Sequence, residues 1–382
     1  MDLQKFAVRL RETRIRSGYT QVQIARRLNI TPQTVSKWER GLSAPDLDNL
    51  IALCDLLDAD LDSLLRESKD ASSVYAAIDG GGTKTEFIAF TSDGHILRRV
   101  VRGSTNPNIA GAETARANIV SGLDELSSGR RISGVFAGVA GSLTPGNSEL
   151  LRDAAASCVT AGNIHIGSDI LNVIFSVRGA EKCIAAICGT GSSVFSWDGA
   201  KLHKYGGWGY LFDGAGSGYD IGCDILRECF AYDDGFGKRS LVVSLAEEKL
   251  GGPAIGRLNE FYTGSRDMIA ALSPIAFEAC RMGDEAANRI IDRNMERLAM
   301  LIRAAGNGSD TVVLSGGLTA QSDIIVPRLV SMLPQKMRIL VPALPQIYGA
   351  ALAAVRFCGI PVQDEAGFDS AFASDYNMLR KE

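Results

Sequence analysis

The sequence lacks the features that mark several classes of protein. None of its apolar runs approaches the roughly 18–20 residues of a membrane-spanning helix, and its N-terminus has no apolar segment of the kind found in signal peptides. We therefore expect a cytoplasmic protein that has no membrane partner. The chain has only three histidines, and its eight cysteines include no C-x-x-C pair. A zinc site or a disulfide framework is accordingly not expected, and buried, reduced thiols are the better interpretation.

Charge is almost balanced over the whole chain, with a formal net charge of −4, but it is segregated near the N-terminus. Up to Arg40, nine basic residues stand against three acidic ones, a net of +6. From Gly41 to Asp70, two basic residues stand against eight acidic ones, a net of −6. A small domain with one basic end suits docking on a polyanion, although a merely solvated charged face gives the same pattern.

Helical patterns dominate residues 1–67, which we expect to form one all-α domain. Thr31 as an N-cap and Pro32 at the first helical position predict a helix that ends before Gly41. The other expected helices are one ending near Gly18, one at 21–28, and two at about 47–57 and 61–66.

The N-terminal segment resembles the phage-repressor-like (XRE/Cro) helix-turn-helix family. The matching residues are Thr20-Gln21-x-x-Ile24-Ala25-x-x-Leu28-x-Ile30-Thr31-x-Gln33-Thr34-Val35-Ser36-Lys37-Trp38-Glu39-Arg40-Gly41. The resemblance implies a homodimer on a double-stranded DNA operator, with the third helix in the major groove. A helix-turn-helix that is kept only for protein contacts is the alternative.

The same resemblance assigns individual roles to residues of this domain. It implies base contacts for Gln33, Thr34 and Lys37, phosphate contacts for Gln21 and Arg40, an inter-helix ion pair between Arg14 and Glu39, and core positions for Val35 and Trp38.

Residues 68–73 predict a linker, because they are polar and have no apolar periodicity. So short a linker would let a change in one domain reorient the other.

Residues 76–90 predict a β-hairpin with a glycine-rich turn. An apolar run ends at Asp79, three glycines and Thr83-Lys84-Thr85 follow, and a second apolar run completes the pattern. Glycines let the backbone approach a ligand, and successive N–H groups form an anion nest. Residues 83–85 add side-chain donors, and Asp79 is suited to hold magnesium through water. An ordinary glycine-rich hairpin has the same sequence pattern.

After this hairpin the strands and helices follow a ribonuclease-H-like order, which then repeats. A second hairpin with the turn Gly189-Thr190-Gly191 begins near Lys182, about 105 residues after the first, and predicts a duplicated half-domain. A third glycine pair, Gly316-Gly317, follows an expected strand at 311–314. Backbone amides at such a junction can receive a nucleotide.

Five motifs, taken in order, resemble the BadF/BadG/BcrA/BcrD ATPase family, and within it the N-acetylglucosamine kinases. They are Asp79-Gly-Gly-Gly-Thr-Lys-Thr, Gly189-Thr190-Gly191-Ser192, Gly206-Gly207-Trp208-Gly209, Gly216-Ser217-Gly218-Tyr219-x-Ile221-Gly222 and Gly316-Gly317. The resemblance implies an α/β ATPase domain of the actin/hexokinase/Hsp70 type, with two lobes and ATP between them. Its expected parts are lobe I at about 74–180, lobe II at about 181–345, a return helix at 346–360, and a tail at 361–382 that is mobile or covers the surface.

The resemblance also implies ATP and Mg²⁺ as cofactors and an amino sugar or sugar phosphate as ligand. It implies that Asp79 holds Mg²⁺. The first phosphate loop would consist of Gly81, Gly82, Thr83 and Lys84, and the second of Gly189, Thr190 and Gly191. Gly316 and Gly317 would lie beside the adenosine, and Asn106 and Trp208 would contact the sugar. For Trp208, a tight turn with a buried indole is an equally good interpretation.

The match weakens at the catalytic base, the carboxylate that a sugar kinase needs beside the attacking hydroxyl. The kinases carry it in a G-x-x-x-S-G-G-D pattern, where this chain has Leu143. Their G-D-E-G-S-G acids are likewise replaced in the segment 213–218. Asp213 and Asp169 are the remaining candidates; Asp169 follows a strand, where such folds bind ligands, and would contact the substrate or cap a helix.

Three functions are compatible with these patterns. They are a transcriptional regulator that senses an amino sugar, with or without phosphorylating it, an active amino-sugar kinase with DNA binding as a second activity, and an ATPase that drives a partner protein. The third function is disfavoured, because the sequence has no cysteine pair suited to an iron–sulfur cluster shared between two subunits.

Overall fold

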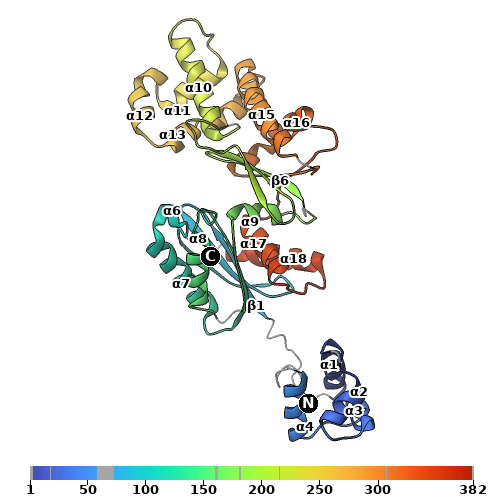
Figure 1. Cartoon of the computed structure of the whole chain (residues 1–382). Coiled ribbons are helices and arrows are strands. Elements are labelled where there is room, and N and C mark those ends of the chain that lie inside the picture. The colour runs from blue at the N-terminus through green and yellow to red at the C-terminus, as the bar shows by residue number, and fades with distance from the viewer. Residues whose placement is uncertain are drawn as a thin grey trace. The chain divides into compact units, whose positions relative to one another are not determined.

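The computed structural model describes residues 3–17, 19–57, 73–159, 162–179, 182–214, 216–306 and 308–380. The chain divides into two compact units, Met1–Val74 and Tyr75–Glu382 (Figure 1). The helix expected at 61–66 and residues 68–72 of the expected linker lie outside the described residues. In the described part of the chain, no helix is both long and apolar enough to cross a membrane.

The N-terminal unit is helical. Its helices are α1 (Leu3–Arg16), α2 (Gln21–Arg27), α3 (Pro32–Glu39) and α4 (Leu47–Leu57). Thr20 caps α2 in a capping box with Gln23, and Thr31 caps α3 ahead of Pro32, as the sequence predicts. The side chains that form the core of this unit are Phe6, Leu10, Ile24, Ala25, Val35, Trp38, Leu50, Leu53 and Leu57. The predicted core positions of Val35 and Trp38 are therefore confirmed.

The first half of the large unit is a five-stranded sheet with helices. The strands are β1 (Val74–Gly80), β2 (Lys84–Phe90), β3 (Ile96–Gly103), β4 (Ile132–Val139) and β5 (Asn163–Gly167), in the order β3-β2-β1-β4-β5. The pairs β1/β2 and β2/β3 are antiparallel, and β4/β5 is parallel. The helices are α6 (Pro107–Ala110), α7 (Ala112–Ser127), α8 (Asn147–Ala156) and α9 (Asp169–Phe175).

The second half repeats this topology. Its strands are β6 (Cys183–Cys188), β7 (Ser192–Trp197), β8 (Leu202–Tyr205), β9 (Thr311–Ser315) and β10 (Arg338–Leu340), in the order β10-β9-β6-β7-β8. Read from β8, this is the strand order of the first sheet, again with antiparallel β6/β7 and β7/β8 and a parallel outer pair. The predicted duplication of a ribonuclease-H-like half is confirmed.

Helices surround the second sheet and return to the first. They are α10 (Gly218–Asp233), α11 (Leu241–Leu250), η1 (Ala254–Arg257), α12 (Leu258–Thr263), α13 (Arg266–Ala270), α14 (Ser273–Arg281), α15 (Glu285–Ala305), η2 (Gly317–Gln321), α16 (Ser322–Met332), α17 (Gln346–Phe357) and α18 (Glu365–Leu379).

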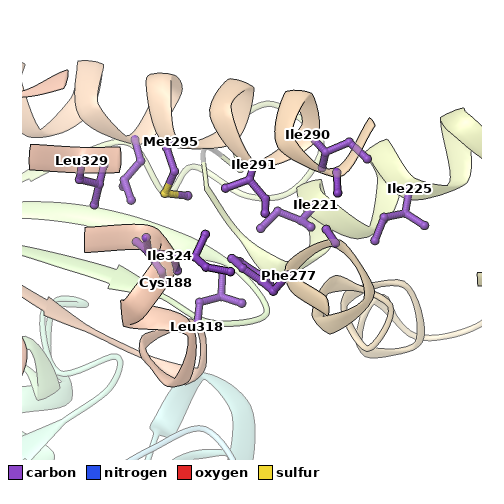
Figure 2. Close-up of a cluster of buried hydrophobic side chains, with 14 of the residues drawn as sticks. Cys188, Ile221, Ile225, Phe277, Ile290, Ile291, Met295, Leu318, Ile324 and Leu329 are labelled. Carbon is purple, nitrogen blue, oxygen red and sulfur yellow. The ribbon is translucent and has the colours of Figure 1, made fainter. Parts of the chain in front are cut away.

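The core of the second lobe is built along α15. Figure 2 shows Ile290, Ile291 and Met295 pointing from this helix toward α10 and the η2–α16 segment. Phe277 of α14 and Leu318 of η2 belong to the same cluster. Both residues also line a cavity described below, so this core fixes one wall of that cavity.

The C-terminal residues form an ordered cover of the first sheet and not a mobile tail. Phe368, Phe372 and Tyr376 recur every four residues on α18 and are buried. Asp375 accepts hydrogen bonds from His95 Nδ1 and from the backbone N–H of Ile96, each at 3.0 Å. The described part of the predicted tail thus contains the helix α18, which packs against the first half of the domain, and the aromatic spacing on one helix face is the physical reason.

Candidate functional site

The first glycine loop joins β1 to β2 and is held close to the segment that follows β3. Gly81 N donates to the carbonyl oxygen of Lys84 at 3.0 Å, and Ser104 Oγ donates to the carbonyl oxygen of Gly81 at 3.0 Å. A Cβ atom on Gly80 would lie 2.5 Å from Thr105 Oγ1, so a side chain does not fit at this position. The loop backbone is thus fixed.

The side chains of this loop differ in accessibility. Thr83 and Lys84 are exposed, as expected for donors to a ligand. Thr85 is fully buried, and its Oγ1 lies 2.9 Å from Thr105 Oγ1 and accepts from Thr105 N at 3.1 Å. The prediction that Thr85 donates to a ligand is wrong, because the strand alternation of β2 turns this side chain into the interior.

Asp79, at the end of β1, is held by Asn172 of α9. Asn172 Nδ2 donates to Asp79 Oδ1 at 2.6 Å and to the carbonyl oxygen of Gly138 at 3.0 Å. The pKa of Asp79 is raised to about 6, chiefly by burial and to a smaller extent by the neighbouring Glu86 and Asp169, while the Asn172 hydrogen bond opposes this rise. Asn172 was not among the predicted site residues, although a lone amide in the apolar run of α9 is a visible signal.

Asp169 is the first residue of α9, one helical turn from Asn172. Ser168, and not Asp169, caps the helix, because Ser168 Oγ accepts from Ile170 N at 3.3 Å. Burial raises the pKa of Asp169, while a 3.0 Å hydrogen bond from Ser168 Oγ lowers it. The structure therefore gathers Asp79, Asn172 and Asp169 at one end of the first sheet.

Asn106 and the loop after β4 lie against each other at this same end. Asn106 Oδ1 caps the short α6 by accepting from Asn108 N at 3.0 Å. A Cβ on Gly141, whose φ is +79°, would lie 2.2 Å from Asn106 Oδ1. Leu143, on the loop that contacts Asn106, is 65% exposed, so this loop presents an accessible apolar side chain.

The second glycine loop, between β6 and β7, is joined to the start of α10. Gly189 N donates to Gly191 O at 2.8 Å, and Gly189 O accepts from Gly218 N at 2.8 Å. Thr190 O accepts from Tyr219 N at 3.1 Å. Thr190 Oγ1 donates to Asp267 Oδ1 at 3.0 Å, a partner that the sequence analysis missed.

The third glycine site adjoins the second. Gly316 has φ +102°, and a Cβ on it would lie 2.3 Å from Cys188 O, so only glycine fits here. Gly189, Thr190 and Gly317 line a cavity of about 330 Å³. The remaining lining residues are Gly218, Asp267, Ala270, Ala271, Ser273, Pro274, Phe277, Leu318 and Gln321. Its largely apolar walls and few polar groups suit a nucleoside, and neither Asp79 nor the first glycine loop lines it.

The loop at 206–214 lies beside the second glycine loop. Trp208 is 65% exposed, which rules out the buried-indole alternative. Asp213 Oδ2 accepts from Gly207 N at 2.5 Å and so supports the turn that presents Trp208. The two candidate bases lie in different parts of the site. The negative charge of Asp213 helps to raise the pKa of Asp220, whereas that of Asp169 helps to raise the pKa of Asp79.

Within the described residues, no group of three or more His, Cys, Asp and Glu side chains converges in a metal-binding arrangement. A magnesium ion here would depend on Asp79 together with phosphate oxygens and water.

The N-terminal unit carries the candidate DNA interface. Gln33 and Lys37 of α3 and the following Arg40 are exposed. Thr34 is half-buried, with its Oγ1 2.9 Å from Thr31 Oγ1.

The expected ion pair beneath α3 is present. Arg14 donates to Glu39 through Nε at 2.6 Å and through Nη2 at 3.1 Å. Gln21 Nε2 also donates to Glu39, at 2.7 Å, so this amide supports the ion pair and does not project freely toward a phosphate.

Two family models match the chain. The BadF/BadG/BcrA/BcrD ATPase family matches residues 77–355, and a helix-turn-helix model matches residues 10–64. The N-acetyl-D-glucosamine kinase of Dictyostelium discoideum is 30% identical over 241 residues, 58% of this chain and 75% of the relative.

Solved structures share the fold. A putative N-acetylglucosamine kinase from Chromobacterium violaceum superimposes with a TM-score of 0.57 at 20% identity, covering 75% of this chain and all of that one. A ROK family transcriptional regulator, described as a homologue of the E. coli MLC protein, has a TM-score of 0.52 at 12% identity and covers 97% of this chain and 98% of its own.

Proposed function

Because this chain belongs to the BadF/BadG/BcrA/BcrD ATPase family, we propose that it is a DNA-binding transcriptional regulator whose ATPase-fold domain binds Mg·ATP and an amino sugar. The observation that carries the proposal is the combination, in one chain, of three features: an exposed helix-turn-helix surface, a nucleotide-sized cavity, and an exposed Leu143 on the loop after β4, where the resemblance to kinases places a catalytic aspartate. A regulator acts on the chromosome, so its place is the cytoplasm.

In the nucleotide site, the adenosine occupies the cavity beside Gly316 and Gly317. The phosphates meet the glycine loops 81–84 and 189–191, with Lys84 as the charged donor. Gly81 N and Gly189 N donate within their own loops, so the N–H groups that follow them are the ones that bind phosphate. Asp79 holds Mg²⁺ through water, and the ion supplies charge neutralisation for the phosphates.

In the sugar site, Asn106 and Trp208 contact the ligand. The oxygen of Asn106 is used in the helix cap, so its amide nitrogen is the group that donates to a sugar hydroxyl. Asp169 accepts a hydroxyl proton or hydrogen bond, because its burial makes it a stronger base than an exposed aspartate. Asp213 supports the Trp208 turn and is the less suitable base.

In the DNA site, Gln33 and Lys37 meet base edges of an operator and Arg40 meets a phosphate. Thr34 contributes from its partly covered position, and Gln21 acts through Glu39. A homodimer on a palindromic site is the arrangement that this kind of module favours. Lobe closure on ligand would then alter operator affinity, and by reciprocity operator would alter ligand affinity.

One experiment separates this function from its main alternative. The full chain is incubated with Mg·ATP and a panel of sugars led by N-acetylglucosamine, and γ-phosphate transfer is measured beside operator binding by gel shift. Absence of transfer, together with ATP binding and a sugar-dependent change of operator affinity, supports the regulator.

The alternative is an active amino-sugar kinase with DNA binding as a second activity. The complete set of three glycine sites favours it. Transfer that is lost in Asp169→Ala, with operator binding indifferent to sugar, would replace our proposal by this one. ATP turnover that only a protein partner stimulates would favour the third function, a partner-driving ATPase.

A further inference from the structure

A second cavity, of about 290 Å³, lies beside the second glycine loop and contains two cationic side chains. Thr190 lines both this cavity and the nucleotide cavity, so the two are neighbours. Lys204 of β8 and Arg266 of α13 supply the positive charge. The turn that presents Trp208 forms part of the wall through Gly207.

Each cation is held by an aromatic face and not by a carboxylate. Lys204 Nζ lies 4.7 Å from the centroid of the Trp208 ring and donates to Gly207 O at 2.8 Å. The guanidinium carbon of Arg266 lies 4.9 Å from the centroid of the Tyr210 ring. Over the described ranges, neither cation has an ion-pair partner. A ring face orients a cation but does not neutralise it, so both charges remain available to an anion.

The other polar groups of the cavity suit the same ligand. Ser192 Oγ is buried and has no hydrogen-bond partner among the described residues. Asp213 is the one carboxylate in the lining, and its Oδ2 is engaged by Gly207 N. The charged side chains of the lining are therefore two cations against one acid.

We propose that this cavity makes the ligand site selective for an anionic amino sugar, a hexosamine that carries a carboxylate or a phosphate group. The inference rests on the proposed function, since it concerns the substituent of the sugar placed beside Trp208. Lys204 and Arg266 bind the anionic group through charge-assisted hydrogen bonds.

The test is isothermal titration of the full chain with three sugars that differ in one substituent. N-acetylglucosamine is neutral, N-acetylmuramic acid carries a carboxylate, and N-acetylglucosamine 6-phosphate carries a phosphate. We expect at least one acidic sugar to bind roughly tenfold more tightly than the neutral one, with a difference that shrinks as salt rises. The stronger of the two acidic ligands identifies the substituent.

Variants assign the preference to this cavity. The double variant Lys204→Gln/Arg266→Gln should lose the preference and keep its affinity for the neutral sugar and for ATP. Lys238→Gln is the matched control, because Lys238 is an exposed lysine of the same lobe outside the cavity and should leave the preference intact.

The outcomes are distinguishable. Equal affinity for all three sugars overturns the anionic preference and leaves the proposed function standing. A preference that survives in the double variant overturns the assignment to Lys204 and Arg266. Failure of every sugar to bind, with ATP still bound, overturns the proposed sugar site and this inference with it.

Discussion

Asn172 joins two strands of the first sheet by donating from one nitrogen to Asp79 Oδ1 at 2.6 Å and to Gly138 O at 3.0 Å. The amide oxygen of Asn172 is buried and has no partner among the described residues. The carboxyl group of Asp79 has a pKa raised to about 6, chiefly by burial. Burial therefore disfavours its ionised form when no cation is bound.

The first prediction concerns stability without ligand. A carboxyl group whose pKa rises on folding binds more protons in the folded state, so the free energy of unfolding falls as pH rises from about 4 to about 6 and stays low above that. Asp79→Asn keeps the acceptor for Asn172 but removes this charge. We expect it to raise the free energy of unfolding at pH 7 by about 1–3 kcal/mol, with the gain vanishing near pH 4. Urea denaturation across pH 4–7.5, without nucleotide or magnesium, measures it; a constant difference between the two proteins over this range would contradict it.

The second prediction concerns the same residue with ligand. Wild-type protein should be stabilised by Mg·ATP more than by ATP with a chelator, because Asp79 carries the metal-dependent part of binding. In Asp79→Ala the two stabilisations should be equal. Thermal shifts at saturating nucleotide provide the comparison. An unchanged magnesium effect in the variant would remove Asp79 from the site.

The third prediction separates base contacts from phosphate contacts on DNA. Gln33→Ala should weaken operator binding by about 1–3 kcal/mol at particular bases, whereas Arg40→Ala should weaken binding to every sequence and reduce its salt dependence. Gel shifts on the operator and on point-mutated operators, at two salt concentrations, measure both effects. Equal losses across all sequences from both variants would refute the base-reading role of Gln33.

The parts of the site that the sequence predicted are those with a local cause. The glycines at 80 and 316 are recognisable because close approach or a positive φ excludes other residues there. The helix at Pro32–Glu39 follows from a cap and a proline that adjoin it. The ion pair between Arg14 and Glu39 could be predicted only from the resemblance to the helix-turn-helix family.

The parts that could not be predicted depend on contacts between distant segments. Asn172 gains its role from Asp79, 93 residues away, and nothing adjacent to either residue reveals the pairing. Trp208 was equally compatible with a buried and an exposed indole, since the choice depends on how the whole turn packs. The α18 helix had a readable aromatic spacing, but its docking surface lies on a strand almost 280 residues earlier.

The fourth prediction concerns the ion pair beneath α3. Glu39 accepts from Arg14 and Gln21, and its side chain is 2% exposed. Glu39→Gln should therefore destabilise the helix-turn-helix by about 2–4 kcal/mol, because it leaves a partly buried guanidinium without its counter-charge. Amide hydrogen exchange in the full chain should show faster exchange in α2 and α3, with α15 unchanged.

A matched control for this prediction is the exposed pair between Arg281 and Asp323, whose side chains are 44% and 57% exposed. Asp323→Asn should alter exchange in its own helices by less than about 1 kcal/mol, since solvent screens such pairs. Similar effects from the two substitutions would show that the Glu39 carboxylate is not a buried structural charge.

The fifth prediction concerns catalysis. Ser142 Oγ donates to Gly167 O at 2.9 Å and so fixes the loop after β4 beside the strand that leads to Asp169. Leu143, next on this loop, is 65% exposed, so an aspartate there costs little stability. Leu143→Asp should raise γ-phosphate transfer to the best-bound amino sugar roughly tenfold or more over wild type, because it returns a general base to the position that the kinases use. Leu143→Asn has the same shape without the base and is the control. Transfer at the wild-type rate by both variants, with sugar and ATP bound, would show that the missing aspartate does not limit catalysis. The limit would then lie in Asp169 or in the closure of the two lobes.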